Sequence, residues 1–373
     1  MNPIPSSRFC RAAFLAACLL ALARSGLADP FPALPALNVD IAETSVSGIS
    51  SGAFMSVQFQ VAHSSIVKGA GVVAGGPYYC AQDDAIRATT QCTCTLDPLH
   101  QVCSVSPTSA DVPALEKATR DFAQKNLIDN PDNLARQRVY VFAGGKDELV
   151  PAPVIDQLDD YYRRLAVPAA NVKTERWAKA GHTMPTMRYG NACPVTDTPY
   201  ISDCNFDGAK EILTWIYGPL ATAKKTKKPK AGGRFIQFDQ TPYLPASQRY
   251  SWTTGMDQSG WLYLPAACER GEPCRLHVAF HGCKQGQSYA LLRPLPDGSV
   301  YYGTTFVRHA GYDTWADANR IAVLFPQAVS IPGLNPNGCW DWWGYTDGNY
   351  ATRKGVQIST VRAMIDRIAS GKR

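Results

Sequence analysis

The feature that most limits the folds open to this chain is an alternation of short apolar segments with longer helical patterns. Runs of five or six apolar residues are typical of strands buried on both faces, and helices between them indicate a mainly parallel sheet. We expect strands at Ala42–Ser47, Gly69–Ala74, Val139–Ala143, Val172–Trp177, Phe235–Phe238, Trp261–Leu264, Leu276–Phe280 and Ile321–Phe325. We expect helices at Ala53–His63, Ala114–Lys125, Pro153–Leu165, Ala209–Tyr217 and Val356–Ile368.

A serine between glycines stands at the first of these strand-to-helix junctions. Gly48-Ile49-Ser50-Ser51-Gly52 matches G-x-S-x-G, the nucleophile elbow of α/β-hydrolases. In such an elbow a sharp turn holds the serine hydroxyl clear of the backbone, and the glycines let strand and helix approach each other. An ordinary turn is the alternative for the motif alone. The preceding strand and the amphipathic helix expected after it favour Ser50 as a nucleophile.

A nucleophilic serine needs a base, and the base needs an acid that orients it. In α/β-hydrolases the acid follows the serine along the chain and the histidine comes last. Asp147 follows the strand that ends at Ala143, and His182 follows the strand that ends at Trp177. Because sites form at the carboxyl ends of parallel strands, Asp147 is the predicted acid and His182 the predicted base. Glu148 is the competing acid.

Acyl transfer also needs backbone N–H groups that stabilise the oxyanion. Ser51, directly after the nucleophile, would supply one, and Cys283, in Phe280-His281-Gly282-Cys283, would supply the other. This second loop usually precedes the nucleophile, but here it follows about 230 residues later. A circular permutation explains that order. The Lys-rich linker 221–233 would join the two usual chain ends, so that residues 29–373 form a single domain.

The other histidines are expected to have structural roles. His63 stands at a helix end, and His100 and His309 stand in segments with the character of a surface. His277 lies within a predicted strand, at an alternating position, so we expect it to be partly buried and hydrogen-bonded.

Ten of the twelve cysteines follow the N-terminal segment, and their even number is typical of disulfides in an oxidising compartment. Cys193 and Cys204 would close a loop, Cys268 and Cys274 would link a hairpin, and Cys283 and Cys339 remain for each other. Two further bridges of open connectivity are expected among Cys80, Cys92, Cys94 and Cys103. Zinc is disfavoured because Cys92-x-Cys94 lacks the usual spacer and no paired histidine ligands follow.

The N-terminus has the pattern of a secretory signal peptide over residues 1–28. Arg8 and Arg11 precede the apolar run Ala12–Ala23, and Gly26 and Ala28 suit cleavage before Asp29. An anchor helix, or a lipoprotein signal ending at Cys18, are the alternatives. The net charge of +6 falls to +3 without this segment and to −2 without the five lysines between Lys224 and Lys230. A nucleic-acid partner is therefore not expected, nor is stable insertion in a membrane.

The motifs together resemble the poly(3-hydroxybutyrate) depolymerase family, in its subgroup with a permuted single catalytic domain. They are G-I-S-S-G-A-F-M, G-G-K-D-E-L-V-P, A-G-H-T, F-H-G-C and N-P-N-G-C-W-D-W-W-G-Y, and the similarity spans residues 39–373. The resemblance implies Ser50, Asp147 and His182 as catalytic residues and Ser51 and Cys283 as oxyanion donors. It also implies that Trp340 and Asn335 contact substrate and that no cofactor or metal is needed.

The loop that contains Trp340 is also informative by itself. Trp340, Trp342, Trp343 and Tyr345 crowd a Gly- and Asn-rich segment, which suits either an aromatic wall for an apolar polyester or a packing cluster. The chain ends after its last predicted helix, without the granule-binding module of many extracellular relatives. Amorphous polymer or soluble oligomers are therefore the expected substrates.

The sequence thus predicts a secreted or periplasmic serine esterase that acts on poly(3-hydroxybutyrate) or its oligomers. Two alternatives stay open: an esterase of other substrates, such as feruloyl esters, short acyl esters or poly(aspartic acid), and a non-catalytic polymer-binding protein on a hydrolase scaffold.

Overall fold

The computed structural model describes residues 31–95, 102–222, 232–248, 250–295 and 297–372. The predicted signal peptide, His100 and most of the Lys-rich linker lie outside these ranges. Cys10 and Cys18 lie outside them as well.

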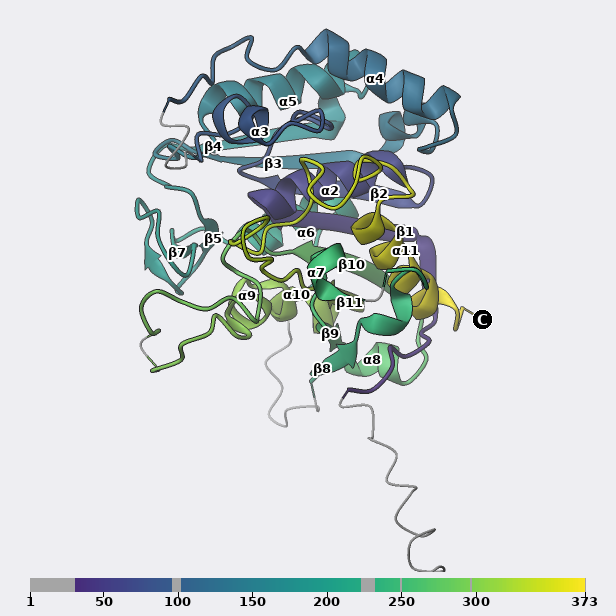
Figure 1. The fold of residues 1–373 in the computed structure, drawn as a ribbon. Helices are drawn as coiled ribbons and strands as arrows, with labels where there is room; N and C mark the ends of the chain where they lie inside the picture. The colour runs from purple at the N-terminus through teal and green to yellow at the C-terminus, as the bar shows by residue number, and fades with distance from the viewer. Residues whose placement is uncertain (1–30, 96–101, 223–231, 249, 296, 373) are drawn as a thin grey trace, which may run out of the picture.

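One eight-stranded sheet crosses the molecule in the order β4-β3-β2-β1-β10-β11-β9-β8 (Figure 1). Neighbours from β4 to β11 are parallel, and β9 is antiparallel to both β11 and β8. The strands are β1 (Val39–Ile49), β2 (Val67–Val73), β3 (Arg138–Gly144), β4 (Val172–Trp177), β8 (Arg234–Asp239), β9 (Ser259–Leu264), β10 (Cys274–Phe280) and β11 (Ile321–Phe325).

The central strands β1 and β10 come from opposite sides of the Lys-rich linker. Because they pair directly, the two parts of the chain share one sheet. This pairing agrees with the expected permuted α/β-hydrolase architecture, while the boundaries 29 and 373 of the predicted domain stay predictions.

Helices pack on both faces of the sheet, and its side chains alternate between them. Val139 and Val141 of β3 face one hydrophobic core, whereas Tyr140 and Phe142 face the other, as the period of two in a strand requires. The first core includes residues of α2 (Ser51–Ala62), α4 (Val112–Gln124), α5 (Ala152–Arg164) and α11 (Val356–Ala369). The second includes residues of α6 (Gly208–Tyr217), α9 (Thr305–His309) and α10 (Tyr312–Asn319).

Each predicted strand and helix is present, with ends shifted by a few residues at most. The prediction that the helix after Ser50 is amphipathic is wrong, since every residue of α2 is buried. The Trp-rich loop before α11 covers its outer side: Trp342 stacks on Phe54 with ring centroids 4.0 Å apart, and Gln58 Nε2 donates to the Asp341 carbonyl at 2.9 Å. Figure 1 shows this loop, in yellow, crossing α2.

Several short elements were not expected from the sequence. Between β4 and α6 lies a small second sheet of β5 (Met184–Thr186), β6 (Asn191–Ala192) and β7 (Ile201–Asp203). Strands of two or three residues are too short to show a hydrophobic period. The short helices α3 (Ala85–Thr90), α7 (Ser251–Thr254) and α8 (Ala266–Glu269) were missed for the same reason.

All ten cysteines of the described chain form disulfides. The three predicted pairs, Cys193–Cys204, Cys268–Cys274 and Cys283–Cys339, are confirmed, and the open connectivity resolves as Cys80–Cys92 and Cys94–Cys103. The expected hairpin is wrong, because Cys268 lies in helix α8 and Cys274 begins β10, which pairs with β1 and β11. Five disulfides are consistent with folding in an oxidising compartment.

Two of the buried histidines, His277 and His63, lie outside the predicted site. His277 is fully buried, not partly as expected; its Nδ1 lies 2.6 Å from Ser45 Oγ and its Nε2 lies 2.7 Å from Ser47 Oγ. His63, at the end of α2, is 5% exposed, and its Nε2 has no hydrogen-bond partner among the described residues. Burial lowers the pKa of each to about 3, so both are neutral in the fold.

These histidines predict a loss of stability in mild acid. In the unfolded chain each imidazole binds a proton near pH 6.5, whereas in the fold it stays neutral down to about pH 3. The stabilisation is therefore present above pH 6.5 and is lost as the pH falls below that value. Each should cost about 2 kcal/mol in the free energy of unfolding between pH 7 and pH 5. Urea unfolding at the two pH values measures this loss.

His63→Leu provides the comparison, because the unpartnered Nε2 makes an apolar replacement tolerable. The variant should lose about 2 kcal/mol less than the wild type over the same pH interval. An identical loss in both proteins would contradict the assignment.

Candidate active site

Ser50 occupies a sharp turn between β1 and α2. Its φ of 57° and ψ of −124° are uncommon for any residue other than glycine, and its backbone N–H donates to the Val73 carbonyl at 3.0 Å. Such a strained conformation is typical of a nucleophile elbow, where neighbouring structure holds the backbone in place.

The two flanking glycines allow the elbow to pack against the end of β10. A Cβ on Gly48 would lie 2.3 Å from the Gly52 carbonyl oxygen, and a Cβ on Gly52 would lie 2.3 Å from the His281 carbonyl oxygen. Both distances are too short for any side chain. The motif therefore brings the helix start into direct contact with the loop predicted to hold the oxyanion.

Asp147 and His182 form a buried hydrogen-bonded pair. His182 Nδ1 lies 2.8 Å from Asp147 Oδ2, and their side chains are 4% and 1% exposed. The other carboxylate oxygen, Oδ1, accepts from the N–H groups of Leu149 and Val150. Because a carboxylate accepts, the neutral imidazole carries its proton on Nδ1 and leaves Nε2 free to act as a base. The competitor Glu148 is exposed.

Glycines again explain how these loops meet. A Cβ on Gly144 would lie 2.5 Å from the Ala180 carbonyl oxygen, so the loops after β3 and β4 can approach only with glycine there. The backbone N–H of His182 donates to Thr196 Oγ1 at 2.9 Å, which anchors the histidine to the segment containing β6 and β7.

A chain of contacts links His182 to Ser50. The His182 ring meets the edge of Tyr200 at 6.4 Å between centroids, and Gln285 Nε2 donates to the carbonyl oxygens of Pro199 and Tyr200. Gln285 Oε1 in turn accepts from Gly282 N–H at 2.7 Å. A Cβ on Gly282 would lie 3.4 Å from Ser50 Cβ. These contacts connect the segment of His182 with the turn that contains Ser50, and the joint role of the two residues stays a prediction.

The two predicted oxyanion donors directly follow Ser50 and Gly282 in the chain. Ser51 begins α2 and Cys283 follows β10, and neither backbone N–H has a hydrogen-bond partner within the described ranges. His281 orders the second loop: its Nδ1 donates to the Gly282 carbonyl at 2.7 Å and its Nε2 accepts from Ala328 N–H at 3.0 Å. Burial lowers the pKa of His281 to about 4, so it stays neutral.

The predicted substrate residues are buried in the Trp-rich loop. Trp340 is fully buried, its backbone N–H donates to Ser51 Oγ at 3.3 Å, and its indole N–H has no partner among the described residues. Asn335 Nδ2 donates to the Cys339 carbonyl at 2.8 Å, and Asn335 Oδ1 accepts from the Cys339 N–H at 2.9 Å. Their contact with substrate stays a prediction.

The other aromatic residues of this loop pack inward. Trp342 and Tyr345 are 6% and 8% exposed, which favours the packing interpretation of the loop over an exposed wall. Asp341 holds the loop together, because its carboxylate accepts from the N–H groups of Gly344, Tyr345 and Thr346. The roles of Asp341 and Gln285 were not predicted from the sequence, although both are polar residues close to a cysteine of the candidate site, a signal that could have identified them.

An open cavity of about 1010 Å³ lies next to Tyr200, whose ring packs against the ring of His182. Tyr200, Lys284, Tyr289 and Tyr302 are among the residues that line it. It lies between the segment of β6 and β7 and the loop that follows Cys283, and the sequence did not predict it.

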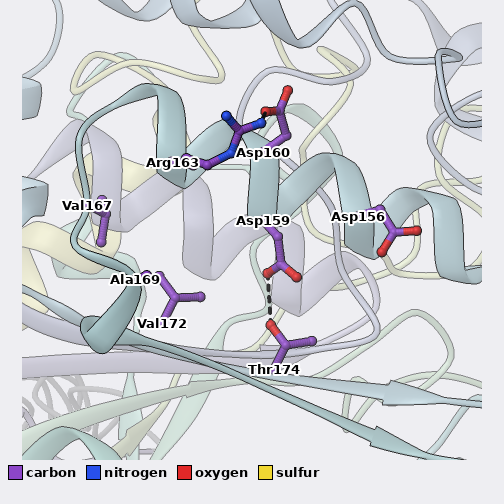
Figure 2. Close-up of a pocket in the computed structure, with 8 residues that line it drawn as sticks. All are labelled: Asp156, Asp159, Asp160, Arg163, Val167, Ala169, Val172 and Thr174. Carbon is purple, nitrogen blue, oxygen red and sulfur yellow. Dashed lines mark hydrogen bonds and ion pairs between the residues drawn. The ribbon is translucent and has the colours of Figure 1, made fainter.

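A second cavity, of about 460 Å³, lies elsewhere, between α5 and β4 (Figure 2). Its charged groups pair locally: Arg163 with Asp160, and Asp159 with Thr174 at 2.8 Å. Val172 at its floor begins β4, whereas His182 follows the other end of that strand.

The described residues contain no cluster of three His, Cys, Asp or Glu side chains arranged to bind a metal. None of the helices they form is long and apolar enough to span a bilayer.

The tight packing of the elbow can be tested with Gly52→Ala. The added methyl group would overlap the His281 carbonyl, so we expect a loss of about 1–3 kcal/mol in the free energy of unfolding, or movement of α2 away from β10. Gly348→Ala is the control, since a Cβ there meets nothing within 4 Å. Equal stability of the two variants in urea would contradict the packing argument.

Known proteins with the same arrangement were found by sequence and by structure, although no family model matches. The chain is 40% identical over 366 residues to a poly(3-hydroxybutyrate) depolymerase of Delftia acidovorans, covering 97% of this chain and 67% of that protein. It is 35% identical over 354 residues to a polyhydroxybutyrate depolymerase of Talaromyces funiculosus, covering 91% and 93%.

Solved structures agree. The crystal structure of PHB depolymerase from Penicillium funiculosum superposes with a TM-score of 0.76 at 32% identity, over 91% of this chain and 100% of that one. A PHB depolymerase complexed with an R3HB trimer gives the same score at 33% identity and the same coverage. This chain therefore belongs to the poly(3-hydroxybutyrate) depolymerase family of carboxylic ester hydrolases.

Proposed function

We propose that this protein is an exported serine esterase that hydrolyses poly(3-hydroxybutyrate) or its oligomers. The observation that carries the proposal is the buried hydrogen-bonded pair of Asp147 and His182, and the strained turn at Ser50 supports it. Membership in the depolymerase family supports the substrate class, and a relative has been solved with an R3HB trimer.

In the proposed reaction His182 Nε2 takes the proton of Ser50 as the hydroxyl attacks the ester carbonyl. The backbone N–H groups of Ser51 and Cys283 stabilise the oxyanion. The ester C–O bond then breaks, His182 returns the proton to the leaving alkoxide, and an acyl group stays on Ser50. Water activated by His182 cleaves this acyl-enzyme and releases a hydroxy acid or short oligomer.

Asp147 acts through His182 in this scheme. Its carboxylate fixes the Nδ1–H tautomer and stabilises the imidazolium that forms when the ring takes a proton. Trp340 and Asn335 are proposed to shape the ester-binding region. The Trp340 backbone N–H donates to Ser51 Oγ, and Asn335 holds the backbone of the neighbouring Cys339 in place.

The proposed location is the periplasm or the outside of the cell. The support is the disulfide content together with the predicted signal peptide. An esterase of other substrates and a non-catalytic binding protein are the rivals, and the intact Ser, His and Asp set argues against the second.

Ser50→Ala tests the nucleophile. Release of 3-hydroxybutyrate from amorphous polymer and from the trimer should fall by a factor on the order of 10⁶, with unchanged urea unfolding. A fluorophosphonate should label the wild type and not the variant. Hydrolysis retained by Ser50→Ala would refute the assignment, and turnover of aryl esters without release from polymer or trimer would favour another substrate.

Asp147→Asn and Glu148→Gln form a matched pair that tests the acid. Asp147→Asn should lower kcat by about 10⁴-fold, because an amide can favour the wrong imidazole tautomer. Glu148→Gln removes an exposed charge and should keep kcat within about twofold of wild type. If Glu148→Gln lowered kcat on the trimer more than Asp147→Asn does, Glu148 would be the orienting acid.

A further inference from the structure

Three cationic side chains line the cavity next to Tyr200: Lys284, Arg293 and Arg308. Lys284 lines the cavity, is half-buried and forms no ion pair with any described residue. It directly follows Cys283, the proposed oxyanion donor.

The backbone holds Lys284 in an unusual conformation. Its φ of 64° lies in the left-handed region, which is disfavoured for lysine, and its N–H donates to the Asn337 carbonyl at 2.6 Å. The Cys283–Cys339 disulfide ties the same two segments together. Strain of this kind persists where surrounding structure fixes a residue, and it is common at ligand-binding sites.

The other charged side chains that line the cavity are Arg308, Asp197, Asp297 and Arg293. The Arg308 guanidinium lies over the Phe235 ring at 4.9 Å. Asp197 Oδ1 accepts from Thr198 N–H and Asp297 Oδ1 from Ser299 N–H, each within its own turn. The exposed Arg293 lies at the rim. Lys284 is thus the cation best placed to receive an anion near the reacting centre.

The chemistry of the leaving group supplies such an anion. His182 returns its proton to the alkoxide that leaves, and Tyr200, which contacts the His182 ring, also lines the cavity. In the proposed reaction the leaving side of the ester would then lie toward this cavity. When the last ester bond of a hydroxyalkanoate oligomer is cut, the leaving alcohol is a 3-hydroxy acid whose carboxylate is only two carbons from the carbon that bears the oxygen.

We propose that Lys284 binds the terminal carboxylate of an oligoester and so directs cleavage to its last ester bond. The inference rests on the proposed function and deepens it, since it makes free-acid oligomers the preferred substrates. The ammonium group donates to the carboxylate, while Pro199, Tyr200 and Tyr289 provide apolar surface for the carbon chain. The products are the released 3-hydroxy acid and, after water attacks, the shortened oligomer.

The test compares the 3-hydroxybutyrate trimer as free acid and as its methyl ester. The wild type should show a kcat/KM about tenfold higher for the free acid, the size expected for one charge-assisted hydrogen bond. Lys284→Met should lose this preference, with kcat/KM for the methyl ester within about twofold of wild type. Lys284→Arg should keep most of it, and 0.5 M NaCl should reduce it.

Lys125→Met is the matched control, because Lys125 is an exposed lysine at the end of α4 and does not line the cavity. It removes the same charge and should leave the preference intact. Equal kcat/KM of the wild type for the two trimers would overturn the inference, as would an equal loss on both trimers in Lys284→Met. If the wild type hydrolyses neither trimer, the proposed function itself fails, and the inference fails with it.

Discussion

The parallel pairing of β1 with β10 is the constraint on which the candidate site depends. Gly48 lies opposite Phe280 in this pair, so the serine turn and the loop that begins at His281 leave the sheet side by side. A shift of one residue would turn Ser50 to the other face of the sheet. Since the two strands come from opposite sides of the Lys-rich linker, the site forms only when both parts of the chain fold together.

A buried polar network reinforces that register. His277 of β10 contacts Ser45 and Ser47 of β1 through its two ring nitrogens, and Ser47 Oγ also lies 2.6 Å from the Tyr312 hydroxyl. Hydrogen bonds of this kind have a fixed partner and geometry, unlike apolar contacts, which tolerate sliding. The network lies only a few residues from the elbow, so it fixes the elbow's position relative to the oxyanion loop.

Much of this arrangement could be predicted from the sequence because it depends on local signals. The elbow glycines, the order Ser50, Asp147 and His182, and the apolar runs of the strands are each visible within a few residues. The burial of α2 was not visible, because the Trp-rich loop that covers it lies almost 300 residues away in the sequence. The roles of Gln285 and Tyr200 depend likewise on contacts between distant segments. Lys284 could not be predicted either, because a single lysine after a cysteine gives no sign of a cavity or of a left-handed backbone conformation.

The candidate site has two sides that differ in what they present to a substrate. On one side the Trp-rich loop is packed against α2 and tied down by Asp341, Gln58 and a disulfide, so its side chains have little freedom to adapt. On the other side lies the open cavity, lined by loops and by a small sheet of very short strands. Oxyanion stabilisation requires donors fixed in place, which the packed side can supply. Discrimination between substrates requires a surface that can vary without disturbing those donors, and the cavity side meets that requirement. The charge carried by Lys284 therefore stands where it can affect which ester is chosen while leaving the chemistry of ester cleavage unchanged.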